Sequence, residues 1–227
     1  MTEQDRIRET YRAYETSGRD RLWDIRNDGF ARLSADRDRA VLDLLARSLP
    51  GTKASLLDVG CGNGTLIGTV IGRWPDVEAT GLDLQPERID EARIGVPDAT
   101  FVVGSADHLP FPDASFDVVS AITLFSSIPT PDMELAAARD VARVLRPGGW
   151  LVWYDLRYDN PNNPAVHGVS AKHLGTLFPG WRQDVRSISL APPIARRLGP
   201  ATQLLYPLLH AIPPLRSHLV GRLRCPS

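Results

Sequence analysis

The chain has 227 residues, of which 43% are hydrophobic and 23% charged, and its formal net charge is −1. This balance is ordinary for a globular protein and excludes a disordered or fibrous chain. No apolar run approaches the roughly 18 residues of a transmembrane helix, the charged N-terminus lacks the apolar core of a secretory signal, and there are two cysteines, Cys61 and Cys225. We therefore expect a cytoplasmic protein without a transmembrane segment or a disulfide framework.

Charge is distributed unevenly along the chain. Residues 182–227 contain seven arginines and one acidic residue, a net charge of +6, whereas residues 49–181 carry −7. A basic tail can serve an anionic substrate, a nucleic acid or a membrane surface, but it is also typical of a solvated arginine face. Because the larger part of the chain is acidic, we expect no nucleic-acid partner.

The first 48 residues are predicted to form an N-terminal helical cap. Residues 3–15 favour a helix, Gly18 interrupts it, and a second helix is predicted at 36–47, where apolar side chains share one side. The aromatic residues of this part are candidates for contacting a substrate, and the alternative is that they dock the helix on the domain. They are Tyr11, Tyr14 and Trp23.

Strands and helices alternate from residue 49 onward. Strands are predicted at 55–59, 78–83, 99–103, 116–122 and 150–154, and helices at 65–73, 86–93 and 131–145. This alternation is typical of a parallel sheet with helices on both faces. The last third differs, with a helix at 170–177 and two strands at 182–190 and 217–224. The sequence therefore predicts an α/β, doubly wound, mostly parallel seven-stranded sheet with an antiparallel last strand, in one domain spanning 49–227.

An insertion, residues 191–215, separates the last two strands. It has many aliphatic residues and no acidic one, so we expect it to form a helix that caps an apolar substrate pocket and shields its leucines from water. A membrane-surface contact, a dimer contact and a purely structural role are the alternatives. The leucines in question are Leu204, Leu205, Leu208 and Leu209.

The sharpest motif is a glycine loop that follows the first predicted strand. Gly60, Gly62 and Gly64 alternate directly after Asp58, and Asp83 ends the next strand. Glycines allow a tight turn and close approach of a ligand, and an acid at the end of the second strand can accept hydrogen bonds from both hydroxyls of a ribose. Dinucleotide sites share this logic, but their third glycine comes one position later, and a pyrophosphate disfavours a carboxylate such as Asp58 nearby.

The segment 57–64 resembles the first motif of the class I S-adenosylmethionine-dependent methyltransferases. Asp83 matches the acid at the end of the second strand in that family. Residues 104–119 are similar to its adenine-binding turn and fourth strand, and residues 143–149 to the turn before its fifth strand. The resemblance covers about residues 40–155, with four motifs in register.

The resemblance implies that the cofactor is S-adenosylmethionine and the product S-adenosylhomocysteine. The three glycines would shape the pocket for the amino-acid part, with Asp58 near its ammonium group, and Ala121 and Ile122 would line the methionine part. Asp83 would bind the ribose and Leu84 would pack on the adenine. Asp107 would accept a hydrogen bond from the adenine amine, with Ala106 beside it, although Asp107 also suits a plain turn.

Catalytic residues are less evident from the sequence. Methyl transfer from a sulfonium is a displacement that positioning accelerates, and a base is needed only where the acceptor must lose a proton. Many relatives have a His-His pair after the fourth strand, where this chain has Ser126 and Ser127. Asp155 and His167 are therefore the candidate bases and Arg157 a candidate acceptor-orienting residue, with loop-capping roles as the alternative. No cysteine pair or His/Glu cluster indicates a metal site.

We expect methyl transfer to a small molecule, with a hydroxyl group of a secondary metabolite or saccharide as the acceptor. The chain resembles bacterial enzymes of such pathways most closely. Two other functions stay open: methylation of RNA or protein, and cofactor binding by a regulator without catalysis. The protein is expected to be a monomer or a homodimer.

Overall fold

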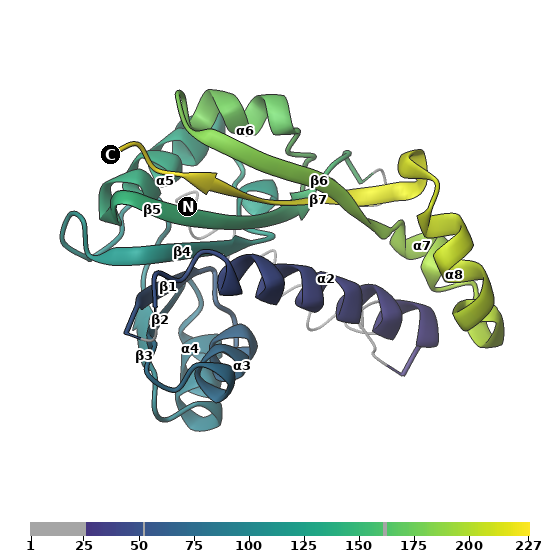
Figure 1. Ribbon diagram of the computed structural model, residues 1–227, viewed down its shortest axis with the longest axis horizontal. Coiled ribbons are helices and arrows are strands. Elements are labelled where there is room, and N and C mark those ends of the chain that lie inside the picture. The colour runs from purple at the N-terminus through teal and green to yellow at the C-terminus, as the bar shows by residue number, and fades with distance from the viewer. Residues whose placement is uncertain (1–25, 52, 161–162) are drawn as a thin grey trace.

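The computed structural model describes residues 26–51, 53–160 and 163–227. Tyr11, Tyr14 and Trp23 lie outside the described residues. In the described part, one seven-stranded sheet is flanked by helices on both faces (Figure 1). The elements are α2 (Asp28–Ala46), β1 (Ser55–Val59), α3 (Thr65–Arg73), β2 (Glu78–Asp83), α4 (Pro86–Gly95), β3 (Thr100–Val103), β4 (Phe116–Ile122), α5 (Pro131–Val144), β5 (Leu145–Leu156), α6 (Ala171–Leu177), β6 (Arg182–Leu190), α7 (Pro192–Ala195), α8 (Thr202–His210) and β7 (Arg216–Arg224).

The sheet confirms the predicted fold class. Its strand order is β3-β2-β1-β4-β5-β7-β6, with β1 to β5 parallel and β7 antiparallel to both β5 and β6. The largest difference from the predicted strand limits is at β5, which begins at Leu145 rather than at residue 150. The pairing of β4 with β5 shifts register between Phe116 and Val118, and Gly148 has a φ of +76° there. The Pro-Gly-Gly turn is thus an irregularity within β5 and does not precede it.

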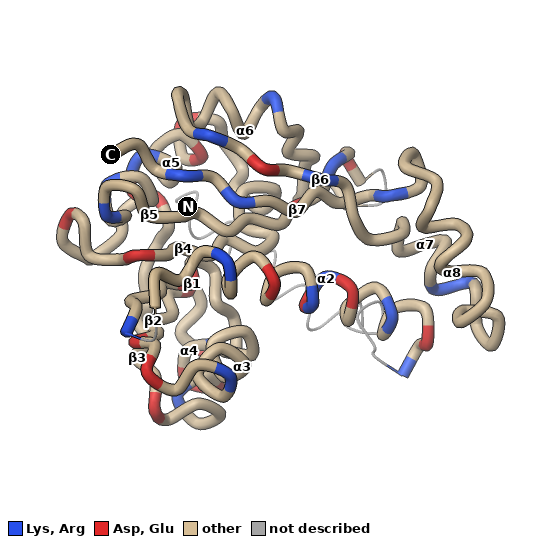
Figure 2. Tube along the Cα trace, viewed as in Figure 1, with Lys and Arg blue, Asp and Glu red and all other residues tan. Residues whose placement is uncertain are grey.

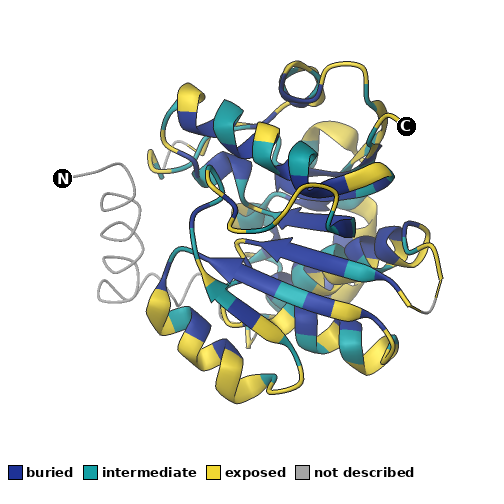
Figure 3. Ribbon diagram, turned by 90° about the vertical axis from the view of Figure 1, so that its left-hand side faces the viewer, coloured by how far each residue is buried: buried dark blue, intermediate teal, exposed yellow. Residues whose placement is uncertain are grey.

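Alternating side chains of the strands build a core on each face of the sheet (Figure 3). On one face, Leu57, Val119 and Trp153 pack with α5 and α6. On the other, Leu56 and Val152 pack with α2, α3 and α4. The carboxyl ends of the parallel strands therefore lie between two rigid helical layers.

Helix α2 is longer than the sequence pattern predicts, since it begins at Asp28 instead of residue 36. The side chain of Asn27 caps it by accepting from the backbone N–H of Phe30 at 3.0 Å. Its second half packs on the sheet through Val41 and Leu45. Its first half contacts the insertion instead, where Phe30 joins a separate apolar cluster (Leu33, Leu190, Ala195 and Tyr206). The helix thus connects the sheet to the insertion.

The insertion folds into the short helices α7 and α8, and the prediction that it shields its leucines is wrong in part. Leu204 is 71% exposed and Leu208 62% exposed. Helix α8 docks through Thr202 and Tyr206, which are buried and one helical turn apart. Leu204 and Leu208 also lie one turn apart but on the outer side. Among the described residues, no helix is both long enough and apolar enough to cross a bilayer.

Figure 2 shows arginines along β6 and β7, and two of those on β7 make contacts within the fold. The Arg222 guanidinium stacks over the ring of Trp150 at 4.2 Å and donates to the backbone carbonyl of Arg47 at 2.8 Å. Arg216 donates to the carbonyl of His210 at 2.7 Å. These contacts fit the interpretation of the basic residues at 182–227 as part of the protein surface.

Candidate functional site

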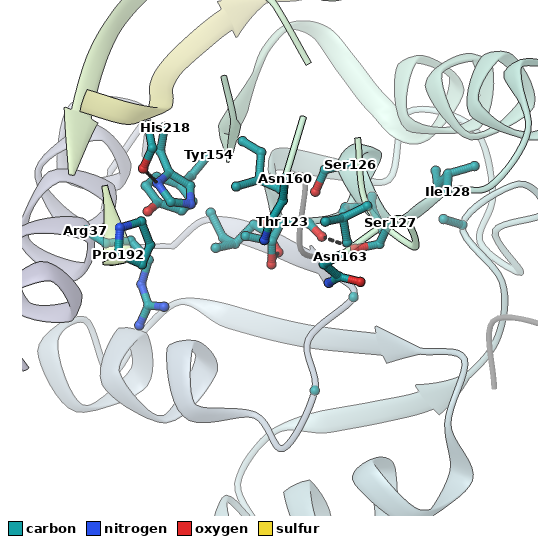
Figure 4. A pocket seen from close by; sticks show the side chains of 18 of the residues that line it. Arg37, Thr123, Ser126, Ser127, Ile128, Tyr154, Asn160, Asn163, Pro192 and His218 are labelled. Atoms are coloured by element: carbon teal, nitrogen blue, oxygen red, sulfur yellow. Dashed lines mark hydrogen bonds between the residues drawn. The ribbon is translucent and has the colours of Figure 1, made fainter. Parts of the chain in front are cut away.

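A cavity of about 1150 Å³ opens at the carboxyl ends of the parallel strands (Figure 4). It is lined by the glycine loop, the residues after β2, β3, β4 and β5, the first half of α2, the start of the insertion and the start of β7. Because β7 is antiparallel, its first residues reach the same edge as the last residues of β5. Segments far apart in the sequence therefore share one site.

The glycine loop adopts backbone conformations that other residues rarely adopt. Gly60, Gly62 and Gly64 have φ values of +78°, +54° and +77°. Gly60 and Gly62 line the cavity. A Cβ on Gly64 would instead come within 2.8 Å of Phe101, so this third glycine allows helix α3 to pack closely on the sheet. Two of the three glycines face a ligand space, and the third serves packing.

Asp83 connects this loop to the cavity. Its carboxylate accepts from the backbone N–H of Gly62 at 2.8 Å and from that of Gln85 at 2.9 Å, and the side chain is almost fully buried at the cavity wall. Leu84 and Ala106 also line the cavity. An acceptor group fixed beside a glycine cradle and an apolar wall fits the ribose and adenine of S-adenosylmethionine.

Asp58 lies beneath the loop and is not among the cavity-lining residues. It is 3% exposed and accepts from the Ser120 hydroxyl, its register partner on β4, at 2.7 Å. Burial raises the pKa of the Asp58 carboxyl to about 7, against the opposing effect of the Ser120 hydrogen bond, and the charge of Asp83 adds to the rise. Its predicted proximity to the cofactor's ammonium, directly or through water, stays a prediction.

Three further predicted residues occupy different positions. Ile122 lines the cavity, whereas Ala121 is fully buried in the core on the α5 side. Alternation along β4 explains this difference, because neighbouring side chains point to opposite faces. Asp107 is hydrogen-bonded to the Ser105 hydroxyl and is not a lining residue, which fits the turn alternative.

Asp155 is not positioned as a base for an acceptor in this cavity. It is fully buried, does not line the cavity, and accepts from the backbone N–H of Ser126 at 3.2 Å and the Trp153 indole at 3.3 Å. Burial raises the pKa of its carboxyl to about 6, while the hydrogen bonds from Ser126 and Leu156 oppose the rise. Its side chain points to the face opposite Tyr154, so its role is to position the turn at Ser126.

His167 and Arg157 also point away from the cavity. The His167 ring lies 3.7 Å from the buried Glu134 carboxylate, which His173 contacts at 2.8 Å, and hydrogen bonding to Glu134 raises the pKa of His167. Arg157 donates to the carbonyl of Pro213 at 3.1 Å and lies over the Tyr158 ring. Neither is a cavity-lining residue. Among the described residues, no group of three or more potential ligands is placed to hold a metal ion.

Several residues that line the cavity were not predicted from the sequence. Tyr154 and His218 stack with ring centres 4.9 Å apart, next to Arg37 and Pro192 (Figure 4). The available signal was the antiparallel last strand, whose first residues must lie at the ligand edge. His218 precedes the core residue Val220 by two positions and so shares its face of the sheet.

Thr123 lines the cavity and has an unusual backbone conformation. It follows β4 with a φ of +56°, and its backbone N–H donates to the Tyr154 carbonyl at 2.7 Å. Its own carbonyl accepts from the Ser127 hydroxyl at 2.9 Å. A threonine in this left-handed region is strained, and such strain is held only where surrounding contacts fix the backbone, often at functional sites.

Known proteins match the central part of this chain. Residues 56–149 match the family model described as a methyltransferase domain. The fatty-acid O-methyltransferase of Mycolicibacterium smegmatis is 38% identical over 110 residues, which cover 47% of this chain and 39% of that protein. The trans-aconitate 2-methyltransferase of an Azoarcus species is 30% identical over 143 residues, which cover 62% and 54%. The chain thus spans about half or less of the length of these curated relatives.

Solved structures show the same fold. An S-adenosylmethionine-dependent methyltransferase from Methanosarcina mazei is 19% identical with a TM-score of 0.61, and covers 81% of this chain and 97% of its own. The [4+2]-cyclase SpnF is 21% identical with a TM-score of 0.64, and covers 83% and 80%. Because proteins with different chemistry share this architecture, the fold by itself does not define the reaction.

Proposed function

We propose, from the premise that residues 56–149 form a class I S-adenosylmethionine-dependent methyltransferase domain, that this protein transfers the methyl group to an oxygen atom of a small organic acceptor. A hydroxyl group of a secondary metabolite or saccharide is the acceptor that the sequence favours. The relatives named above, of which one is a fatty-acid O-methyltransferase, support a small acceptor and an oxygen.

One observation carries this proposal. The same cavity joins the edge lined by Gly62 and Asp83 to a chamber lined by Phe30, Leu33 and Tyr154. Its volume of about 1150 Å³ exceeds the roughly 300–1,000 Å³ of ordinary small-molecule sites, so it has room for a cofactor and a second small molecule together.

The chain's residues divide the work between binding and positioning. When bound, S-adenosylmethionine supplies a methyl group on a positively charged sulfur, ready for displacement. Gly60 and Gly62 let the backbone approach that ligand, and Asp83 offers its carboxylate to ribose hydroxyls. Thr123 and Tyr154 fix the backbone between the two halves of the cavity, so their contribution is alignment of the acceptor.

Methyl-labelled S-adenosylmethionine tests the proposal. Binding of S-adenosylhomocysteine is measured first by calorimetry, and label transfer is then followed with pools of small hydroxylated and acidic metabolites, RNA and protein. We expect label in the small-molecule fraction and no salt-sensitive RNA complex. Label in RNA or protein would contradict the proposed acceptor class, and binding without transfer to any pool would identify a regulator.

The insertion, residues 191–215, is proposed as a lid over the acceptor chamber. Its first residues, including Pro192 and Arg197, line the cavity, and it rests on α2. The insertion approaches helix α2 closely at Gly29, where an added Cβ would lie 1.8 Å from the carbonyl oxygen of Ala195. A lid held this way depends on glycine at position 29.

Replacing Gly29 with alanine is therefore expected to displace α7 from α2. The overlap should lower the free energy of unfolding by about 1–3 kcal/mol and reduce methyl transfer, while affinity for S-adenosylhomocysteine stays within about tenfold. The matched control is Gly72→Ala, another helical glycine whose Cβ would meet nothing within 4 Å. Normal transfer by the Gly29 variant would show that the insertion is no lid.

A further inference from the structure

Three arginines line the acceptor side of the cavity. Arg37 comes from α2, and Arg196 and Arg197 follow directly after α7. The two elements are joined tightly, since the Asn27 side chain donates to the carbonyl of Arg196 at 3.1 Å next to the Gly29 contact. The backbone segments that carry these arginines are therefore held together at one corner of the site.

Few acidic groups balance these arginines within the cavity. Of the two acids that line it, Asp83 is bound to backbone amides at the glycine loop, and Asp159 accepts from the backbone N–H of Gly168 at 2.8 Å. Arg37 contacts Asp38 at 2.7 Å, but that acid is 56% exposed, and ion pairs at the surface contribute little. The acceptor chamber is consequently a positively charged corner.

The other polar groups of this corner carry no negative charge. Burial, together with the smaller effect of the Arg37 charge, lowers the pKa of His218 to about 4, so the imidazole is neutral at neutral pH. Its Nδ1 lies 2.9 Å from the Ser217 hydroxyl. Burial raises the pKa of the Tyr154 hydroxyl, which stays protonated and shares a hydrogen bond of 3.1 Å with Ser189. The walls beside them are apolar: Phe30, Leu33, Pro192 and Pro193.

We infer that the acceptor is an amphipathic anion, whose carboxylate or phosphate group is bound by Arg37 and Arg197 while its apolar part lies against Phe30, Leu33 and Pro192. This inference rests on the proposed function, because it concerns the acceptor half of the same cavity. Guanidinium groups bind both anions through paired hydrogen bonds. The carboxylate that contacts Arg37, that of Asp38, is 56% exposed and outside the cavity lining, so it competes only weakly with an anion inside the cavity.

The experiment compares three probes of equal chain length: octanoate, octyl phosphate and octan-1-ol. Each is titrated calorimetrically into the full-length protein saturated with S-adenosylhomocysteine. One or both anions should bind at least about tenfold more tightly than the alcohol, because hydrogen bonds to charged groups exceed those to neutral ones. The stronger anion identifies the headgroup.

Arginine variants test whether the anion binds at this corner of the cavity. Arg37→Gln combined with Arg197→Gln should weaken the preferred anion by about tenfold or more and leave octan-1-ol unchanged. Arg39→Gln is the matched control, because Arg39 lies on the same helix, exposed and outside the cavity lining.

Equal binding of alcohol and anions, binding of none of the probes, or anion binding that the double variant leaves intact would each overturn the inference. Failure of the proposed function is a separate result, since it would appear as loss of S-adenosylhomocysteine binding or of all methyl transfer in the unaltered protein. An effect of the double variant on the S-adenosylhomocysteine titration would also count against a role confined to the acceptor.

Discussion

Asp83→Ala is expected to weaken binding of S-adenosylhomocysteine by about 1.5–3 kcal/mol, which corresponds to a roughly 10- to 150-fold higher dissociation constant. The substitution removes the acceptor proposed for the ribose hydroxyls. It also releases the backbone N–H groups of Gly62 and Gln85, which the carboxylate holds at 2.8 and 2.9 Å. Calorimetric titration of the purified variant measures this change.

The control for this variant is Asp98→Ala, which removes an exposed carboxylate outside the cavity lining. It should bind S-adenosylhomocysteine as the unaltered protein does. A titration with NAD accompanies both variants and should give no heat of binding. Unchanged affinity of the Asp83 variant, or preferential binding of NAD, would contradict the assignment of this edge to S-adenosylmethionine.

Asp58→Asn is expected to stabilise the ligand-free protein at pH 8 by about 2–4 kcal/mol, since each unit of pKa shift corresponds to about 1.4 kcal/mol. The folded protein retains the Asp58 proton up to about pH 7, whereas the unfolded chain releases it near pH 3.8. The folded state thus binds more protons within this window, and its free energy of unfolding falls as the pH rises. Asparagine keeps a side-chain oxygen for Ser120 without the buried charge.

Denaturant unfolding between pH 4 and pH 8 measures the difference, which should shrink toward pH 4. Asp117→Asn serves as a control, because we expect the opposite effect on the free energy of unfolding. The Asp117 carboxylate accepts from the Ser55 backbone N–H at 2.8 Å and pairs with Arg146 at 2.7 Å, and these contacts hold its pKa below its usual range. That variant should lose stability at neutral pH and approach the unaltered protein in acid. A pH-independent effect at Asp58 would contradict the buried-charge explanation.

The order of the strands along the chain, and the limits of several of them, could be predicted from local patterns. The limits of β1, β2, β4 and β6 match the predicted residues, because alternating apolar runs and flanking Gly or Pro fix a strand locally. The cofactor edge could be predicted for the same reason. The loop from Gly60 to Gly64 and the acid at Asp83 each follow a strand directly, and in a parallel sheet such positions meet at one edge.

The acceptor side could not be predicted in this way, because it is assembled from segments that meet only in the folded chain. Asp155 follows the predicted strand as an active-site residue would, yet it lies within β5, whose alternation buries it away from the cavity and turns Tyr154 toward the cavity. His218 reaches the site because β7 is antiparallel, and Arg37 because α2 extends past the sheet to the insertion. The exposure of Leu204 was decided likewise by which face of α8 docks on α2.

By itself, the sequence determined the class of fold, and it predicted the edge of the sheet that we propose for the cofactor, since both depend on residues within a few positions of each strand end. The tertiary structure alone decided which side chains line the rest of the cavity, because that depends on strand alternation, on the direction of the last strand and on the packing of α2 against the insertion through Gly29. The meeting of residues as distant in the sequence as Arg37 and His218 in one cavity has no local signature in the chain.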